Sequence, residues 1–180
     1  MANYKLDKDD CILIIIDMQE KLMKAMPTRE KVYKNTNLLL AAAEQMDIPV
    51  IVTEQYPSGL GATVDEIKVN LKEYEYFDKM EFSAYPGLTK LISASRKTLL
   101  VTGSETHVCI YQTTRDLIEN GYNVHLVKDA VCSRFEENYL NGLELMRDMG
   151  AVITNTETVL FDLLQLAGSP DFKVISKMLK

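Results

Sequence analysis

Short apolar runs alternate with longer amphipathic stretches along this chain, and this alternation restricts its fold more than any other feature. Six runs have the length and residue types of β-strands: residues 11–16, 49–53, 74–79, 97–103, 123–130 and 151–155. The first, CILIII, is apolar throughout, which is typical of a strand covered on both faces. The third is more polar, so we expect it to be more exposed.

Segments with helical periodicity lie between these strands or follow the last one: residues 29–45, 64–71, 89–95, 106–120, 136–149, 156–167 and 171–178. Residues 56–63 are rich in glycine and proline and predict a loop. Strands and helices that alternate at roughly 30 residues per unit predict successive βαβ units. We therefore expect a three-layer α/β/α fold with a doubly wound, six-stranded, mainly parallel sheet in the order 3-2-1-4-5-6.

Length, charge and cysteine content restrict the class of protein. A chain of 180 residues predicts one domain over residues 1–180. Its net charge of −6 disfavours nucleic acid and anionic membranes as partners. The first ten residues contain no apolar segment typical of a secretion signal. With three cysteines, an odd number, this indicates free thiols and a cytoplasmic location.

The carboxyl ends of the first and fourth strands are the expected place for a site, because ligands of open α/β sheets bind where the strand order reverses. Asp17 follows the first strand, and the turn with Cys109 follows the fourth. We expect Thr106 to cap the next helix, which places Cys109 in its first turn. There the helix dipole would lower the pKa of the thiol, and unpaired N–H groups could bind an oxyanion.

Simpler interpretations of these residues stay open. A cysteine is often only a small buried apolar residue, and Asp17 could cap the loop after its strand. Cys11 opens a buried strand and Cys132 is expected in a loop, so both are interpreted as structural. The thiol redox sensor is a further alternative, in which Cys132 would resolve an oxidised Cys109.

The sequence lacks the motifs of several other chemistries. It contains no GxGxxG, GxxxxGK[ST] or GxSxG pattern, which disfavours dinucleotide, P-loop and serine-hydrolase sites. Its two histidines are poor candidates for a base: His107 is expected to point away from Cys109, and His125 lies in the middle of a predicted strand. Asp17 is therefore the favoured base.

Four segments resemble the isochorismatase-like cysteine hydrolase superfamily in order and spacing. They are IIIDMQ (14–19), VTEQYPSGLGAT (52–63), FDKMEFSA (77–84) and VTGSETHVCIYQTTRDLIENGYNVHLVKDA (101–130). The second is most similar to the subgroup of isochorismatase domain-containing proteins. The resemblance covers most of the chain.

The resemblance implies a catalytic triad of Asp17, Lys79 and Cys109. Composition alone would interpret Lys79 as a solvated surface lysine. The resemblance also implies a cis peptide bond between Ser104 and Glu105, and an oxyanion hole formed by the N–H groups of Glu105 and Cys109.

Two departures from the family narrow the expected activity. The segment TEQYPSGLG has no histidine where related nicotinamidases carry a metal motif, so neither a metal nor a cofactor is expected. Isochorismatases proper lack the cysteine that is present here as Cys109. Attack on an acyl carbon of a small amide-type substrate is then the expected reaction, with Gln19, Tyr56 and Phe82 lining the pocket.

The resemblance also implies a homo-oligomer, a dimer or larger. A non-catalytic binding or assembly module on the same fold is the remaining alternative. Such a module would need no reactive thiol.

Overall fold

A six-stranded parallel sheet forms the centre of the computed structural model, which describes residues 4–179. Its order is β3-β2-β1-β4-β5-β6, so the predicted order is confirmed. The strands are β1 (Cys11–Ile16), β2 (Val50–Gln55), β3 (Glu75–Lys79), β4 (Thr98–Ser104), β5 (Asn123–Cys132) and β6 (Val152–Thr154). Every paired strand is parallel. This is a Rossmann-like, doubly wound architecture.

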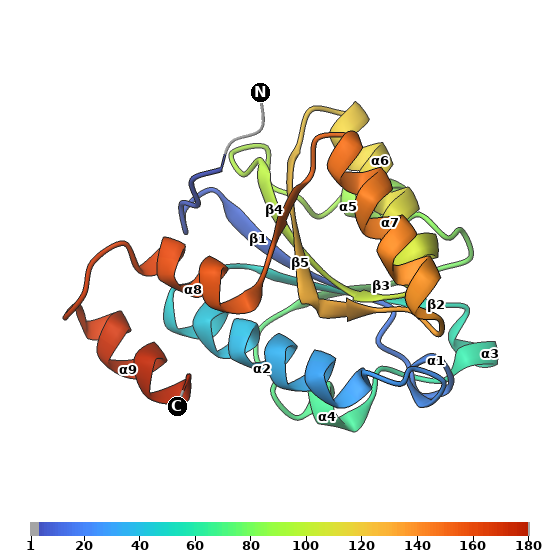
Figure 1. The fold of residues 1–180 in the computed structure, drawn as a ribbon, viewed down its shortest axis with the longest axis horizontal. Helices are drawn as coiled ribbons and strands as arrows, with labels where there is room; N and C mark the ends of the chain where they lie inside the picture. Colours follow the sequence, from blue (N-terminus) through green and yellow to red (C-terminus); the bar gives the residue numbers. More distant parts are fainter. Residues whose placement is uncertain (1–3, 180) are drawn as a thin grey trace.

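Helices cover both faces of the sheet, as Figure 1 shows. One face carries α2 (Arg29–Gln45), α4 (Asp65–Lys68), α8 (Thr156–Leu164) and α9 (Pro170–Met178), and the other carries α5 (Tyr85–Leu88), α6 (Tyr111–Glu119) and α7 (Glu136–Asp148). Successive residues of β1 point to opposite faces. Leu13 and Ile15 join the core under α2, whereas Ile12, Ile14 and Ile16 join the core under α6 and α7. This explains the continuous apolar run.

The carboxyl ends of β1 and β4 approach each other closely because residue 103 is glycine. Gly103 has φ +124°, and a Cβ atom there would lie 1.9 Å from the carbonyl oxygen of Ile16. No other residue type fits this contact without moving one strand. The register between β4 and β5 also shifts here, between Val101 and Gly103.

The helix predicted over residues 89–95 is wrong. The structure has α5 four residues earlier, at Tyr85–Leu88, followed by turns. Pro86 lies in the first turn of α5, where its restricted φ suits a helix start. Ser93 then accepts a hydrogen bond from the backbone N–H of Ser95, and such local bonds compete with a helix.

Other parts of the secondary structure also differ from the prediction. The predicted loop over residues 56–63 contains the short helix α3 (Pro57–Leu60), and α1 (Glu20–Lys24) follows β1. The predicted helix over 64–71 is shortened to α4. Cys132 is the last residue of β5 rather than part of a loop, because pairing with β4 resumes at Ser104 and Cys132 after the register shift. Within residues 4–179, no helix has the length and apolar character needed to cross a bilayer.

Candidate active site

An ion pair lies at the carboxyl ends of β1 and β3. Lys79 Nζ is 2.6 Å from Asp17 Oδ2, and their side chains are 4% and 0% exposed. The second carboxylate oxygen, Oδ1, accepts a 2.6 Å hydrogen bond from Thr53 Oγ1 in the second half of β2. Ser104 Oγ, from β4, donates to the carbonyl oxygen of Asp17. Three neighbouring strands thus hold this one buried acid.

Lys79 is not the solvated surface lysine that composition suggests, because its ammonium contacts four acceptors. Besides Asp17, it donates to Gln55 Oε1 at 2.9 Å and to the carbonyl oxygens of Phe82 and Glu81 at 3.0 and 3.2 Å. The two carbonyls belong to the segment after β3, which folds back onto the Lys79 ammonium. The ammonium therefore joins β1 and β2 to this segment.

Cys109 lies beside the ion pair and is 5% exposed. Its Sγ is 3.9 Å from Gln55 Oε1. The pKa of the thiol is raised to about 12, mainly by burial and then by the negative charge of Asp17 and a hydrogen bond with Asp17, against the opposing charge of Lys79. Cys109 is therefore a neutral thiol at pH 7. The expectation of a low thiol pKa is wrong, because desolvation outweighs the favourable effects of the helix start and of Lys79.

The turn that carries Cys109 also differs from the predicted α-helix start. Residues Thr106–Ile110 form a π-helical turn, η1, which leads into α6, and Cys109 is its fourth residue. Thr106 is the first residue of η1 rather than its cap, and its hydroxyl is buried without a hydrogen-bond partner among the described residues. The peptide bond between Ser104 and Glu105 is cis.

The raised pKa predicts how the reactivity of the Cys109 thiol changes with pH. Because the reactive form is the thiolate, its alkylation by iodoacetamide should speed up about tenfold per pH unit from pH 7 to pH 10 without levelling off. A thiol with an ordinary pKa of about 8.5 would level off above pH 9. Mass spectrometry of the Cys109 peptide measures the rate, and a plateau below pH 9 would contradict the assigned environment.

Gln55 belongs to the cluster and was missed by the sequence analysis. Its Oε1 lies between Lys79 and Cys109, and its Nε2 donates to the carbonyl oxygen of Met80 at 2.7 Å. The predicted strand ended at residue 53, whereas β2 continues to Gln55. Extending that strand by two residues would have put Gln55 at the same sheet edge as Asp17.

Comparisons with known proteins identify the family of this chain. The isochorismatase domain model matches residues 11–158. The chain belongs to the isochorismatase domain family. A secreted isochorismatase effector, Isc1, of Phytophthora sojae is 42% identical over 176 residues, which cover 94% of this chain and 84% of the effector. Isochorismatase domain-containing protein 2 of Xenopus laevis is 37% identical and covers 97% of this chain and 86% of the frog protein.

A solved structure shows the same isochorismatase fold in another relative. The structure of the MAR1 ribonuclease from Caenorhabditis elegans superposes with a TM-score of 0.91 and is 35% identical, covering 97% of this chain and 92% of that one. The family match and these relatives support a hydrolase of the isochorismatase family.

The three residues predicted to line the pocket of this isochorismatase domain occupy different positions. The side chains of Tyr56 and Phe82 lie at the sheet edge, at residues that are 48% and 53% exposed. Gln19 is fully buried, and its amide is paired with the backbone of Gln55 and Gly61. These bonds join Gln19 to the end of β2 and to the loop that follows Tyr56 in the chain. Contact of Tyr56 and Phe82 with a substrate stays a prediction.

The histidines of the isochorismatase domain take no direct part in the cluster. His107 Nδ1 is 3.0 Å from Ser133 Oγ, and His125 is buried in β5. Within the part of the chain that the structure describes, no group of three or more histidine, cysteine or acidic side chains is arranged to hold a metal ion.

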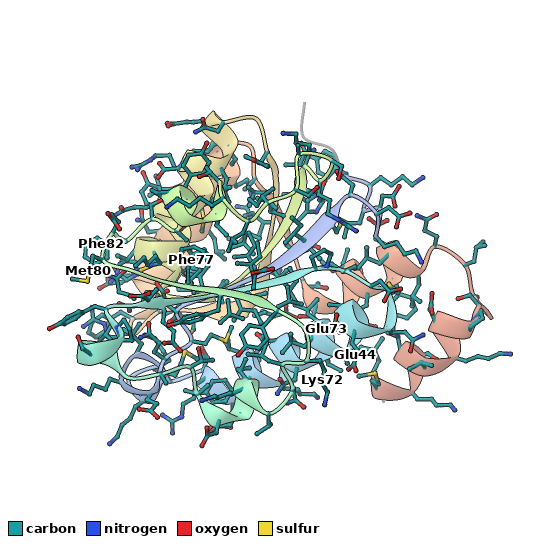
Figure 2. The ribbon with its side chains drawn as sticks, turned by 180° about the vertical axis from the view of Figure 1, so that it is seen from behind. Glu44, Lys72, Glu73, Phe77, Met80 and Phe82 are labelled. Atoms are coloured by element: carbon teal, nitrogen blue, oxygen red, sulfur yellow. The ribbon has the colours of Figure 1, made fainter. Side chains whose placement is uncertain are left out.

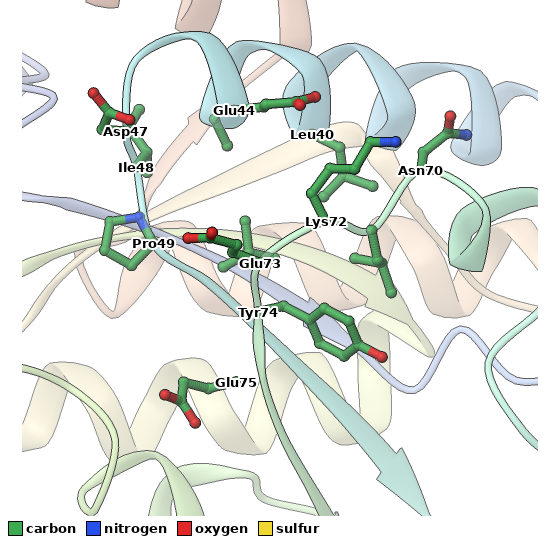
Figure 3. A pocket seen from close by; sticks show the side chains of 13 residues that line it. Leu40, Glu44, Asp47, Ile48, Pro49, Asn70, Lys72, Glu73, Tyr74 and Glu75 are labelled. Atoms are coloured by element: carbon green, nitrogen blue, oxygen red, sulfur yellow. The ribbon is translucent and has the colours of Figure 1, made fainter.

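A large cavity lies away from the cluster. A cavity of about 810 Å³ lies at the opposite end of the sheet, between the end of α2 and the segment before β3, with Glu44, Lys72 and Glu73 around it (Figure 3). Figure 2 shows these three side chains well away from Met80 and Phe82. A smaller cavity of about 300 Å³ adjoins β3 and is lined in part by Lys79, Glu81 and Ser83.

Proposed function

We propose that this isochorismatase domain is a cysteine hydrolase that cleaves the C–N bond of a small amide-type substrate. The observation that carries the proposal is the meeting of the Cys109 thiol with the Asp17 carboxylate and the Lys79 ammonium in one buried cluster. A thiol, a base and a cation in one cluster are the groups that nucleophilic attack on an acyl carbon requires. Each comes from a different strand end, as a site at the sheet edge demands.

The first half of the reaction forms a thioester. Asp17 takes the thiol proton as Cys109 Sγ attacks the carbonyl carbon, so that the S–C bond forms while the carbonyl electrons move to oxygen. The N–H groups of Glu105 and Cys109 bind this oxyanion. Asp17 then gives the proton to the leaving nitrogen, and the C–N bond breaks. A neutral resting thiol fits this sequence, because the base acts during attack.

The second half releases the acid. Asp17 takes a proton from a water molecule, whose oxygen attacks the thioester carbon, and the C–S bond breaks. The proton returns to the departing sulfur, which restores the neutral thiol. Lys79 stabilises the negative charge that passes between the carboxylate and the sulfur, since its ammonium is within 2.6 Å of Asp17 and is shielded from water.

The redox-sensor alternative is disfavoured by the positions of the cysteines. Cys109 packs in the core under α6 and α7, whereas Cys132 packs in the core under α2, on the opposite face of the sheet. All three cysteines are free. A disulfide between residues 109 and 132 would have to pass through the sheet, so Cys132 is poorly placed to resolve an oxidised Cys109.

Ribonuclease activity enters as an alternative because the similar nematode structure carries that name. The net charge of −6 argues against it, since RNA binding depends on cationic surface. The cytoplasmic location and the homo-oligomer stay predictions, and the Phytophthora relative is named as a secreted protein.

A substrate screen tests the proposed function. Wild-type protein is incubated with a panel of small primary amides and carbamoyl compounds, ammonia release is measured, and a rapid acid quench traps any acyl adduct for mass spectrometry. We expect ammonia release with one class of amide and an added acyl mass on the Cys109 peptide alone. Turnover of an RNA oligonucleotide without any amide turnover would contradict the proposal.

A further inference from the structure

The carboxylate of Glu105 ties the nucleophile turn to an arginine on another strand connection. Glu105 directly precedes η1, and its carbonyl oxygen accepts hydrogen bonds from the N–H groups of Val108 and Ile110, on either side of Cys109. Its side chain is 8% exposed, and Oε2 accepts from both the backbone N–H and the Nε of Arg134, each at 3.1 Å. Arg134 follows β5, and its side chain is 53% exposed.

The same segment contacts the turn at two more points. Ser133 Oγ pairs with His107 Nδ1 at 3.0 Å. Gly142 of α7 lies so close to the turn that a Cβ atom there would be 3.1 Å from the carbonyl oxygen of Thr106. Helix α7 thus packs directly on η1, beside α6 (Figure 1). The turn is held by residues 133–142 on one side and faces Asp17 and Lys79 on the other.

We propose that Arg134 is a positioning residue for Cys109 and acts through the carboxylate of Glu105. The proposal rests on the proposed role of Cys109 as nucleophile. Reacting groups must stay within about 0.5 Å of their productive geometry. Arg134 contributes to this by fixing the side chain of Glu105. The carbonyl oxygen of Glu105 accepts the hydrogen bonds that organise the turn, and its N–H group is the proposed donor of the oxyanion hole. The Arg134 side chain is half-exposed, and Glu105 would keep its hydrogen bond from the backbone N–H of Arg134 after the guanidinium is removed, so the effect on global stability should be small and the effect on the turn local.

The charges around the thiol support the same role. The groups that act on Cys109 are Asp17 and Glu105, whose negative charges raise the pKa of the thiol, and Lys79, which lowers it. The guanidinium of Arg134 offsets the charge of Glu105. Removing Arg134 therefore acts against thiolate formation as well as against the position of the turn.

Alkylation of Cys109 in the full chain tests this inference. Iodoacetamide is the probe, and mass spectrometry of the Cys109 peptide gives the rate constant at several values between pH 7 and pH 9. We expect R134Q to lower this rate constant about fivefold or more at each pH, because side chains in one hydrogen-bonded network are energetically coupled. R134K, which can still donate to Glu105, should recover the rate to within about twofold. R29Q, which removes the exposed Arg29–Glu30 pair, is the matched control and should leave it unchanged.

Two further measurements separate positioning from general damage. In an E105Q background, R134Q should slow alkylation less than about twofold, because the partner through which it acts is already altered. All variants should keep their Tm within about 3 °C of wild type. The inference is overturned if R134Q reacts as fast as R29Q, if R134Q is as damaging in the E105Q background, or if a slow rate accompanies a lower Tm that R134K does not restore.

These outcomes stay distinct from a failure of the proposed function. Alkylation measures the thiol itself and requires no turnover of an amide. If R134Q is alkylated as fast as the wild type, the positioning role is overturned while Cys109 stays the proposed nucleophile. If hydrolysis survives without Cys109, the assignment of Cys109 as nucleophile is overturned.

Discussion

Replacing Cys109 with alanine should lower kcat/KM at least about 10³-fold on any amide that the wild type hydrolyses, because the atom that forms the thioester is removed. Groups that act as a unit lose most of their effect when one is deleted, so adding a second change at Asp17 should cost little more. Steady-state ammonia release measures both variants. The acyl adduct should disappear from the quenched C109A protein.

C132A is the matched control for this substitution. Cys132 is also a buried free thiol, with its pKa likewise raised to about 12 by burial, but it lies on the opposite face of the sheet. We expect C132A to keep kcat/KM within about threefold and to lose only the stability that a small buried cavity costs. Full turnover by C109A would refute the cysteine mechanism, whichever substrate is used.

Replacing Lys79 with methionine should destabilise the fold as well as abolish turnover. The side chains of the Asp17–Lys79 pair are 0% and 4% exposed. Removing the cation leaves a buried carboxylate uncompensated, which costs about 3–5 kcal/mol of unfolding free energy. For a chain of this size that is roughly 10 °C in Tm. Urea unfolding followed by circular dichroism gives the free energy, and K34M, at an exposed lysine of α2, should change it by less than about 0.5 kcal/mol.

The double variant D17N/K79M distinguishes a buried charge from lost packing. With both charges removed, no ion is left unpaired, so the double variant should be more stable than K79M alone by about 1–3 kcal/mol. It should remain inactive. Losses that simply add would mean that the two groups do not compensate each other, and the geometry assigned to the cluster would be wrong.

The fold was largely predictable because its main determinant is local and repeated. An apolar run such as residues 11–16 can be buried on both sides only if helices cover both faces, and a strand–helix alternation makes the strands parallel. The strand order then follows from the doubly wound arrangement and is confirmed. The helix expected over residues 89–95 failed because Pro86 and the serines after it act through specific turn contacts, which periodicity does not register.

Parts of the site could be located by the same reasoning. Asp17 and Cys109 were selected because they follow neighbouring strands at the switch point, and the structure places them together. Lys79 was selected only through the family resemblance, since a lysine after an exposed strand carries no signal of its own. Gln55 was missed because the end of β2 was placed two residues early.

The sequence by itself determined the layers, the strand order and the sheet edge at which a site would form, since these depend on residue patterns along short stretches. The tertiary structure alone decided the protonation state of Cys109 and the four contacts of Lys79. Both depend on how much water is excluded and which charges face each other across strands distant in sequence. Desolvation is a property of the packed environment, so a helix-start position in the sequence predicted the wrong pKa for this thiol.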